Sequence, residues 1–191
     1  MAKRGPAGKY RRWRRKGLLL ALLVALVFSF GVPAWILFPP QETVVPADVV
    51  MVIAGESDGR HQLGAELVEV GMAPNFVVSN PSGTRDRVGS AHCRGARRPE
   101  AATATWCLQP EPVTTTGEAL TMGRLAEKES WSSATVVTSR LHARRVRTML
   151  RQCTDLDVTV VYVDYIDQDI VVHQVLHEIG GYIKFWATNP C

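Results

Sequence analysis

VVMVIAG, at residues 49–55, is apolar on nearly every position and ends in a glycine. A strand with this pattern is buried on both faces, which is typical of a parallel sheet covered by helices. Three more apolar runs of strand length follow it, NFVVS at 75–79, ATVVTS at 134–139 and DVTVVYVD at 157–164. Helical patterns alternate with them, at about 61–71, 117–129, 141–152 and 168–187. We therefore predict an α/β fold, a three-layer sandwich with a mainly parallel, Rossmann-like sheet.

A longer apolar segment lies upstream. Residues 17–38 carry no charge over 22 positions, and a helix of that length is about 33 Å long, enough to span a hydrocarbon core of about 30 Å. Residues 1–16 hold eight cations and no acid, a flank that is retained on the cytoplasmic side. The sequence predicts a cytoplasmic tail, one transmembrane helix in the plasma membrane and an extracytoplasmic C-terminal part. The alternative is a cleaved signal peptide, because Val-Pro-Ala at 32–34 suits a signal peptidase.

The segment between the span and the first strand, 39–47, contains three prolines and no helical periodicity, which favours a short, stiff stalk. The domain is then expected over 48–191. The formal net charge of +4 is misleading, because the tail holds 8 of the 22 cations and leaves 14 against 18 acids. The outer domain is mildly acidic, so nucleic-acid binding is not expected, and contact with membrane lipid accounts for the basic tail.

All four cysteines, Cys93, Cys107, Cys153 and Cys191, follow the span, where an oxidising compartment permits disulfides. An even count fits two bridges, and four cysteines allow three pairings. We favour Cys93–Cys107 within one loop and Cys153–Cys191 at the C-terminus. No metal site is expected from the cysteines, because the chain has no Cys-x-x-Cys pair or matched histidine spacing.

Residues 80–113 are rich in Pro, Gly, Ser and Arg and show no usable periodicity. Loops of this length inside a domain are usually functional or disordered. A Cys93–Cys107 bridge favours an ordered flap over the carboxyl edge of the sheet, where such sheets bind ligands. A surface excursion without function is the alternative.

The strongest local signal for chemistry is VVTSRLHARR at 136–145, where a buried strand ends and a helix begins at once. Ser139 is expected to be the N-cap of that helix. Four arginines crowd the first two turns, where the helix dipole disfavours cations by about 0.3–1 kcal/mol each. A bound anion would resolve this conflict. We expect Arg145 to hold it, with a solvated surface arginine as the alternative.

His142 begins the stripe of this helix that faces the sheet, at the open end of the strand edge. This position makes it the candidate for proton transfer or ligand contact, with a hydrogen-bonded packing histidine as the alternative. Arg145 follows three residues later, within reach of the same point.

Other strand ends add candidates. AGESDGR at 54–60 supplies Gly55, which allows close backbone approach, and Arg60, which can reach a ligand over the same edge. Ser79 ends the second strand, and an ordinary turn role is its alternative. These three positions are expected to meet at one edge of the sheet because parallel strands end together.

TTTGEA at 114–119 marks another helix start. Thr115 and Glu118 have the spacing of a capping box, and that structural role is sufficient for both. The helix N-terminus would still offer N–H groups to an anion, with a hydroxyl from Thr116.

His177-Glu178 matches the start of the zinc-protease motif HExxH, but Gly181 occupies the position of the second histidine, so a zinc protease is rejected. His173 and His177 share a helix face at a spacing that could bind a metal. A polar helix face explains them better, and no metal ligand is predicted.

Together these segments resemble the YdcF-like family of bacteria, which includes SanA-type envelope proteins. The resemblance covers essentially the whole outer domain, and its most specific element is the Thr-Ser, His and Arg cluster of 137–145. The other matching segments are DVVMVIAG, Arg60, GMAPNFVVS at 71–79, TTGEA at 115–119 and HEIGGYIKFW at 177–186. It implies a pocket lined by Asp48, Gly55, Arg60, Ser79, Thr116, Glu118, Ser139, His142 and Arg145.

The sequence departs from the family pattern after the second strand, where Asn80-Pro81 replaces the usual Ser-Gly-Gly. Pro110 and Val113 also stand where the family has an acidic residue and a serine. The resemblance implies a role in envelope barrier integrity and cell-wall biogenesis. It implies no single reaction, although some members resemble proteins that bind S-adenosylmethionine or nucleotide-like ligands.

We therefore expect an envelope protein that binds an anionic, phosphate-bearing ligand such as a wall or lipid-carrier intermediate. Arg145 and Arg60 would hold the anion, and His142 would move protons if the protein is a hydrolase or transferase. The rival is a non-catalytic scaffold that recruits envelope or wall-biosynthesis proteins. S-adenosylmethionine is disfavoured because it is cytosolic, and no cofactor is assigned beyond a phosphate-bearing or nucleotide-like ligand.

Overall fold

The computed structural model describes residues 6–55 and 58–191, and the chain divides into two compact units that meet between Phe38 and Pro39. The first unit consists of α1 (Pro6–Leu26), a π-helical turn (Val27–Gly31) and α2 (Val32–Leu37). The π-turn ends two residues before Pro33, which has no N–H to donate to a helical hydrogen bond. Within this unit Trp13–Leu37 forms a helix of 25 residues, long and apolar enough to cross a membrane.

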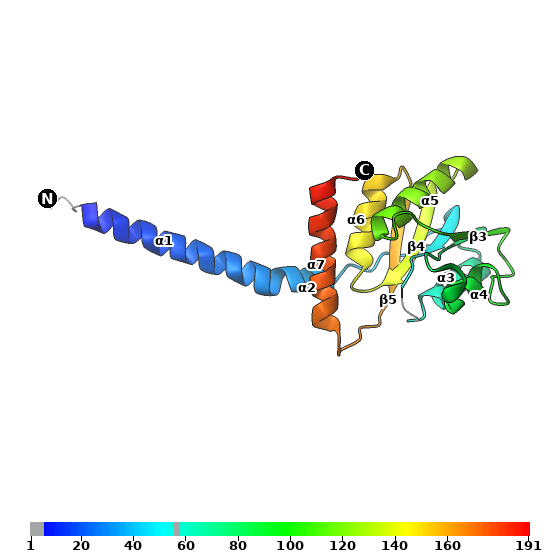
Figure 1. The fold of residues 1–191 in the computed structure, drawn as a ribbon, viewed down its shortest axis with the longest axis horizontal. Helices are drawn as coiled ribbons and strands as arrows, with labels where there is room; N and C mark the ends of the chain where they lie inside the picture. Colours follow the sequence, from blue (N-terminus) through cyan, green and yellow to red (C-terminus); the bar gives the residue numbers. More distant parts are fainter. Residues whose placement is uncertain (1–5, 56–57) are drawn as a thin grey trace. The chain divides into compact units, whose positions relative to one another are not determined.

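The second unit is built on a five-stranded, all-parallel sheet in the order β3-β2-β1-β4-β5 (Figure 1). Its strands are β1 (Val49–Val52), β2 (Asn75–Ser79), β3 (Ala104–Leu108), β4 (Ser133–Ser139) and β5 (Asp157–Val163). β1 is central, with Met51 opposite Val77 of β2 and Val136 of β4. The chain builds outward from β1 to β3 and then returns to add β4 and β5 on the other side. The predicted α/β fold with a parallel sheet is confirmed, and the strand order reverses between β1 and β4.

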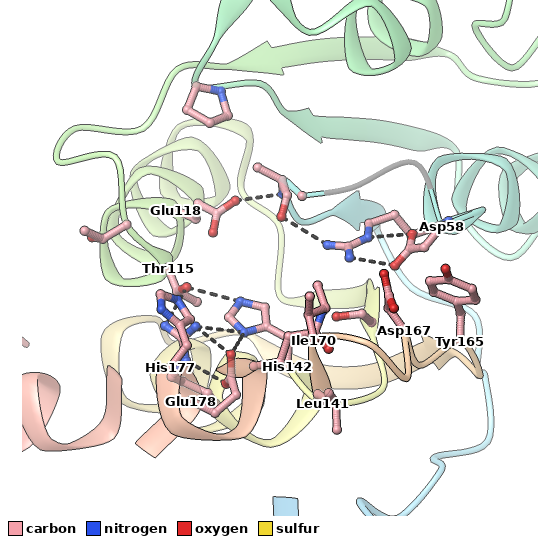
Figure 2. Close-up of a pocket in the computed structure, with 18 of the residues that line it drawn as sticks. Asp58, Thr115, Glu118, Leu141, His142, Tyr165, Asp167, Ile170, His177 and Glu178 are labelled. Atoms are coloured by element: carbon pink, nitrogen blue, oxygen red, sulfur yellow. Dashed lines mark hydrogen bonds and ion pairs between the residues drawn. The ribbon is translucent and has the colours of Figure 1, made fainter. Parts of the chain in front are cut away.

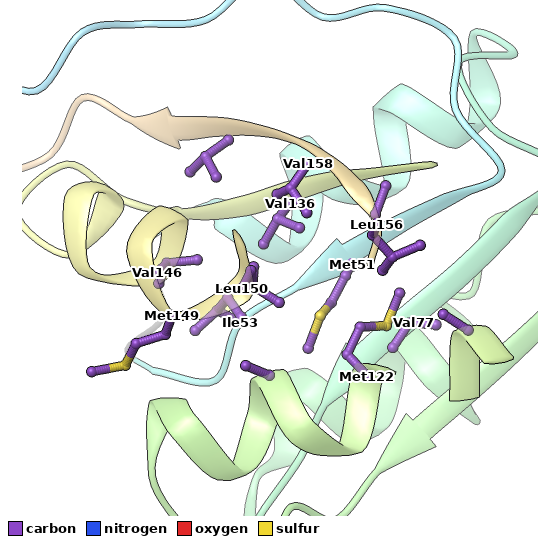
Figure 3. Close-up of a cluster of buried hydrophobic side chains, with 14 of the residues drawn as sticks. Met51, Ile53, Val77, Met122, Val136, Val146, Met149, Leu150, Leu156 and Val158 are labelled. Atoms are coloured by element: carbon purple, nitrogen blue, oxygen red, sulfur yellow. The ribbon is translucent and has the colours of Figure 1, made fainter. Parts of the chain in front are cut away.

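Helices cover both faces of the sheet. On one face lie α3 (Arg60–Glu69) and α4 (Arg87–Cys93), and on the other α5 (Thr115–Glu129), α6 (Ala143–Cys153) and α7 (Val171–Thr188). Successive residues of β1 enter the two cores alternately, because side chains alternate across a strand. Met51 belongs to the core under α5 and α6, where Met122 and Leu150 also lie (Figure 3). Val50 and Val52 belong to the core under α3.

The segment 80–113, expected as a loop without regular structure, contains a short 3-10 turn (Gly83–Arg85), α4 and the edge strand β3. The residues of β3 are only half-buried. As an edge strand, β3 is covered less completely than β1 and β4, whose residues are almost all buried. The predicted disulfides are both confirmed, Cys93–Cys107 joining α4 to β3 and Cys153–Cys191 joining α6 to the C-terminal residue.

Residues 39–47, expected as a free stalk, pack against the domain, and we call them the strap. The Tyr162 hydroxyl of β5 donates to the Pro39 carbonyl at 3.0 Å. Glu42 accepts a backbone N–H from β5 and pairs with Arg147 of α6, whose Nε lies 2.9 Å away. The strap is thus held to β5 and α6 of its own unit.

Candidate active site

A cleft of about 510 Å³ opens at the carboxyl ends of β1 and β4. Gly55 follows β1 and Ser139 ends β4, and both line it. The far wall comes from α7 and the loop before it, which bring Asp167 and His177 to the cleft (Figure 2). This is the point where the strand order reverses, which is where open parallel sheets bind ligands.

His142 lies at the start of α6 with one ring nitrogen toward each of two other helices (Figure 2). Its Nδ1 is 2.9 Å from Glu178 Oε1 of α7, and its Nε2 is 3.2 Å from Thr115 Oγ1 of α5. Arg145 Nη2, a donor, also lies 3.0 Å from Nδ1, but the carboxylate can only accept at 2.9 Å, which favours the ring proton on Nδ1 and leaves Nε2 to accept from the hydroxyl. We call Thr115, His142 and Glu178 the relay. A histidine oriented in this way has the arrangement of a general base.

Arg145 joins the relay from one turn further along α6. Its Nε and Nη2 donate to the two Glu178 oxygens at 2.8 Å each, and Nη1 donates to Thr115 Oγ1 at 3.1 Å. This two-pronged contact fixes the plane of the carboxylate. Gly181 of α7 leaves the room it needs, because a Cβ there would lie 2.8 Å from Arg145 Cδ.

The protonation states of the relay follow from its surroundings. Burial alone would raise the pKa of Glu178, but attraction to His142 and hydrogen bonds from Arg145 and His142 outweigh it and lower the pKa to about 2. Burial lowers the pKa of His142, against the attraction of Glu178. At neutral pH the carboxylate is therefore ionised and the imidazole neutral, which is the state that can accept a proton.

Glu118 lines the same cleft with the opposite shift. Burial raises the pKa of its carboxyl, and interactions with the Ser79 hydroxyl and the Ala54 N–H act against this. Its Oε1 accepts the Ala54 N–H at 2.9 Å. Two titratable groups whose pKa values are pushed in different directions are a basis for assigning an acid and a base.

Arg60 is the second arginine of the cleft, and it is engaged locally. Its Nε and Nη2 bind the Asp58 carboxylate at 2.8 and 2.6 Å, and Nη1 donates to the Ala54 carbonyl at 3.1 Å. Gly55 permits this arrangement, because a Cβ there would collide with the Arg60 guanidinium. The guanidinium thus closes the turn after β1.

Three of the four arginines at the start of α6 are paired with carboxylates of the protein itself. The dipole conflict that led us to expect a bound anion is therefore offset within the chain. The partners come from α7, the strap and the loop after β5, all distant in sequence. The pairs are Arg145 with Glu178 at 2.8 Å, Arg147 with Glu42 at 2.9 Å, and Arg140 with Asp164 at 2.7 Å.

Both predicted helix caps were wrong by a few residues. Thr114, not Thr115, caps α5, and its Oγ1 accepts a backbone N–H at 3.1 Å. Ser139 still belongs to β4, and α6 begins later, at Ala143. The displacement matters, because it frees the Thr115 hydroxyl and the Glu118 carboxylate from capping and leaves both at the cleft.

The cleft gathers most of the residues that the sequence singled out, namely Gly55, Arg60, Glu118, Ser139, His142 and Arg145. Three others lie elsewhere. Ser79 is fully buried beside Glu118, and the Thr116 hydroxyl donates to Met149 Sδ at 3.6 Å. Asp48 precedes β1 and accepts the Ser132 N–H at 2.8 Å, so it lies at the opposite end of the strand.

Sequence reasoning missed the partners of His142. Glu178 was considered only as part of an HExxH motif, although it is the one acidic residue in the long apolar helix α7. That isolated acid is the signal that could have identified it, because a charge on an apolar helix needs a partner. Among the described residues, no group of three or more His, Cys, Asp or Glu side chains is arranged to hold a metal ion.

Comparisons with protein-family models, with curated proteins and with solved structures find no match. The fold and the cleft define an α/β domain with a ligand crevice at the reversal of its strand order. The function is therefore inferred from the residues of that crevice.

Proposed function

We propose that this protein is a membrane-anchored, extracytoplasmic enzyme of the cell envelope that hydrolyses or transfers a phosphate-bearing group. The observation that carries the proposal is His142, a neutral imidazole held between Glu178 and Thr115 at the cleft. A histidine in that setting is suited to proton transfer at neutral pH.

The location is supported by three features. The basic tail 1–16 favours a cytoplasmic N-terminus in the plasma membrane, with the domain outside. The helix Trp13–Leu37 is long and apolar enough to cross the bilayer. The two disulfides suit an oxidising compartment.

The relay supplies the base in this mechanism. The Thr115 hydroxyl takes a proton from the attacking water or hydroxyl as it passes its own proton to His142 Nε2, and the ionised Glu178 stabilises the imidazolium that forms. Glu118, whose pKa is raised by burial, is the candidate to donate a proton to the leaving oxygen. Proton transfers of this kind contribute about 10²–10⁴-fold to a rate.

The phosphate would be held by the N–H groups at the starts of α5 and α6, both of which contribute residues to the cleft. Arg145 and Arg60 are each paired with a carboxylate, so they supply fixed N–H dipoles beside the reacting group and no unpaired positive charge. A wall precursor or a lipid-carrier phosphate is the substrate class we favour, because the strap keeps the domain at the membrane.

The test uses the full chain in detergent micelles with polyprenyl phosphates and diphosphates, lipid-linked wall precursors, nucleotides and S-adenosylmethionine. Release or transfer of phosphate is measured for the wild type, His142→Gln and His177→Gln. The last variant is the matched control, because His177 lines the cleft outside the relay. We expect His142→Gln to lower turnover by about 10²–10⁴-fold and His177→Gln to leave it within a few fold.

Turnover of none of these substrates, or full turnover by His142→Gln, would contradict the enzyme proposal. If a ligand raises the thermal midpoint but is not converted, the protein is a binding protein. If no ligand does either, the scaffold that recruits other envelope proteins becomes the better explanation.

A further inference from the structure

α7 carries a row of apolar side chains that the fold does not cover. The row consists of Val172, Leu176, Ile179, Ile183 and Trp186, and we call it the α7 stripe. Four of its members are 58–72% exposed, and Ile179 is half-buried. The spacing of four and three residues places them within an arc of roughly 80° on the helix. A continuous apolar row of this size on a surface marks an interaction site.

The stripe is separate from the surface by which α7 packs on the domain. That packed surface is formed by Val175, Glu178 and Phe185, the last of which joins the core under α5 and α6. His173 and His177 turn to the cleft instead. The stripe therefore contributes neither to the core nor to the cleft.

The strap shows on which flank of the domain the chain preceding it enters. Arg147 of α6 pairs with Glu42 of the strap and donates to the Pro40 carbonyl at 3.3 Å. The next residue of α6, Thr148, contacts the Tyr182 hydroxyl of α7 at 3.4 Å. The strap and α7 thus occupy adjoining flanks of α6. Because Pro39 is the first residue of the second unit, the chain enters the domain beside α7.

The composition of α7 suits a lipid surface. Its single acidic residue, Glu178, is buried and paired with Arg145, so the exposed part of the helix carries no negative charge toward anionic lipid. Lys184 and Trp186 lie near its end, and both residue types favour the interface between headgroups and acyl chains.

We infer that the α7 stripe lies in the outer leaflet of the membrane that holds the apolar helix, at the level of the headgroups. The inference rests on the chain connection to that helix, on the contacts of the strap and on the exposure of the stripe. This inference does not depend on the proposed reaction. Insertion of the α7 stripe would hold the α7 wall of the cleft at the level of the lipid headgroups. Ligands with a lipid tail would then reach the cleft without leaving the bilayer.

The test is fluorescence quenching of the full chain in lipid nanodiscs that contain brominated phosphatidylcholine and phosphatidylglycerol. The chain has five tryptophans, so the contribution of Trp186 is obtained as the difference between the wild type and Trp186→Phe. Trp106→Phe is the matched control, because Trp106 is on β3, at the sheet edge opposite β5.

We expect bromination near the carbonyl end of the acyl chains to lower the Trp186 contribution roughly twofold or more and to leave that of Trp106 unchanged. A Trp186 contribution that is quenched no more than that of Trp106 would overturn the inference. If, in addition, an Ile183→Cys variant forms a disulfide-linked dimer in the same nanodiscs, the stripe binds a second copy of the chain instead. Neither result depends on turnover, so the proposed reaction is tested separately.

Discussion

The two faces of the sheet hold their helices by different means. On the α3–α4 face, Arg60 pairs with Asp58, two residues away, and Cys93 is bonded to Cys107, 14 residues away. On the α7 face, Arg145 pairs with Glu178, 33 residues away, and Cys153 with Cys191, 38 residues away. The Arg60–Asp58 pair and the Cys93–Cys107 disulfide fix local loops, because they join residues that are close in sequence. The second set attaches a helix that buries few apolar side chains of its own.

Two buried histidines, one on each face of the sheet, also differ in their hydrogen bonds. His142 is hydrogen-bonded to Glu178 and Thr115, and its environment prepares it for proton transfer. His61, at the start of α3, faces His92 at a ring separation of 5.5 Å and has an Nε2 without a hydrogen-bond partner among the described residues. The histidine that is prepared for proton transfer is therefore the one held by ion pairs between residues distant in sequence. The ion pair between neighbouring residues on the other face stabilises the fold.

The largest expected effect comes from breaking the distant ion pair. Glu178→Leu leaves the Arg145 guanidinium buried without its carboxylate, and we expect the free energy of unfolding to fall by about 3–5 kcal/mol. Asp58→Ala should cost less, because Arg60 keeps the Ala54 carbonyl. Urea unfolding of the full chain in micelles, followed by circular dichroism, measures both. An equal or larger loss for Asp58→Ala would show that the two pairs do not differ as we argue.

The two disulfides should also differ in how much they stabilise the domain. Replacing both Cys153 and Cys191 by serine opens the longer loop, and the chain-entropy model gives a loss of about 4 kcal/mol, against about 3 kcal/mol for the Cys93 and Cys107 pair. Protease digestion should also cut the α7 end first in the former variant, because α7 has lost its terminal link. Preferential cutting elsewhere would contradict this role of Cys153–Cys191.

Acid should destabilise the two faces in different pH ranges. Burial and the charge of His92 lower the pKa of His61 from 6.5 to about 4, so its neutral form stabilises the fold above pH 6.5 and that contribution, about 3 kcal/mol, is lost as the pH falls toward 4. The pKa of Glu178 is lowered from 4.5 to about 2, so its contribution, also about 3 kcal/mol, is present above pH 4.5 and lost toward pH 2.

Two variants separate these ranges. His61→Phe should flatten the stability profile between pH 6.5 and 4, and Glu178→Gln should flatten it between pH 4.5 and 2. Denaturant midpoints measured across pH 2–8 report both. A wild-type profile that is flat between pH 6.5 and 4 would refute the assignment of His61.

The smallest effect concerns two neighbouring glycines of α7. Gly180→Ala meets no atom within 4 Å, so it should stabilise the helix by about 0.5–1 kcal/mol. Gly181→Ala would place its Cβ 2.8 Å from Arg145 Cδ and should destabilise the protein by about 1–3 kcal/mol. Thermal midpoints of the two variants, compared side by side, should move in opposite directions.

Much of the fold could be predicted because it is encoded locally. Unbroken apolar runs predict the central strands, because both faces of these strands are covered by helices. β3 and α4 escaped prediction because an edge strand and a helix of 7 residues leave only weak periodic signals. The α5 cap was misplaced because three threonines, Thr114 to Thr116, stand at that helix start and only backbone geometry selects among them. The α6 cap was misplaced because a turn separates Ser139 from the helix.

The candidate site was predicted less completely. His142 and Arg145 share one segment, so their proximity follows from helical spacing. Their partner Glu178 lies on a helix that returns to α6 after β5, and nothing in the local pattern of α7 indicates which side chain it meets. The charges of α6 looked uncompensated in the sequence because the carboxylates that pair with Arg145 and Arg147 are distant along the chain. The bound anion stays a prediction.

The sequence by itself determined the apolar helix that can cross a membrane, the parallel α/β architecture and the favoured pairing of four cysteines. These depend on composition, on period and on short separations along the chain. Only the tertiary structure decided that the strap binds the domain, that the arginines are internally paired, and that Thr115, His142 and Glu178 form a relay. Each of those contacts joins residues tens of positions apart, and such contacts are selected by packing of the whole sheet and its helices.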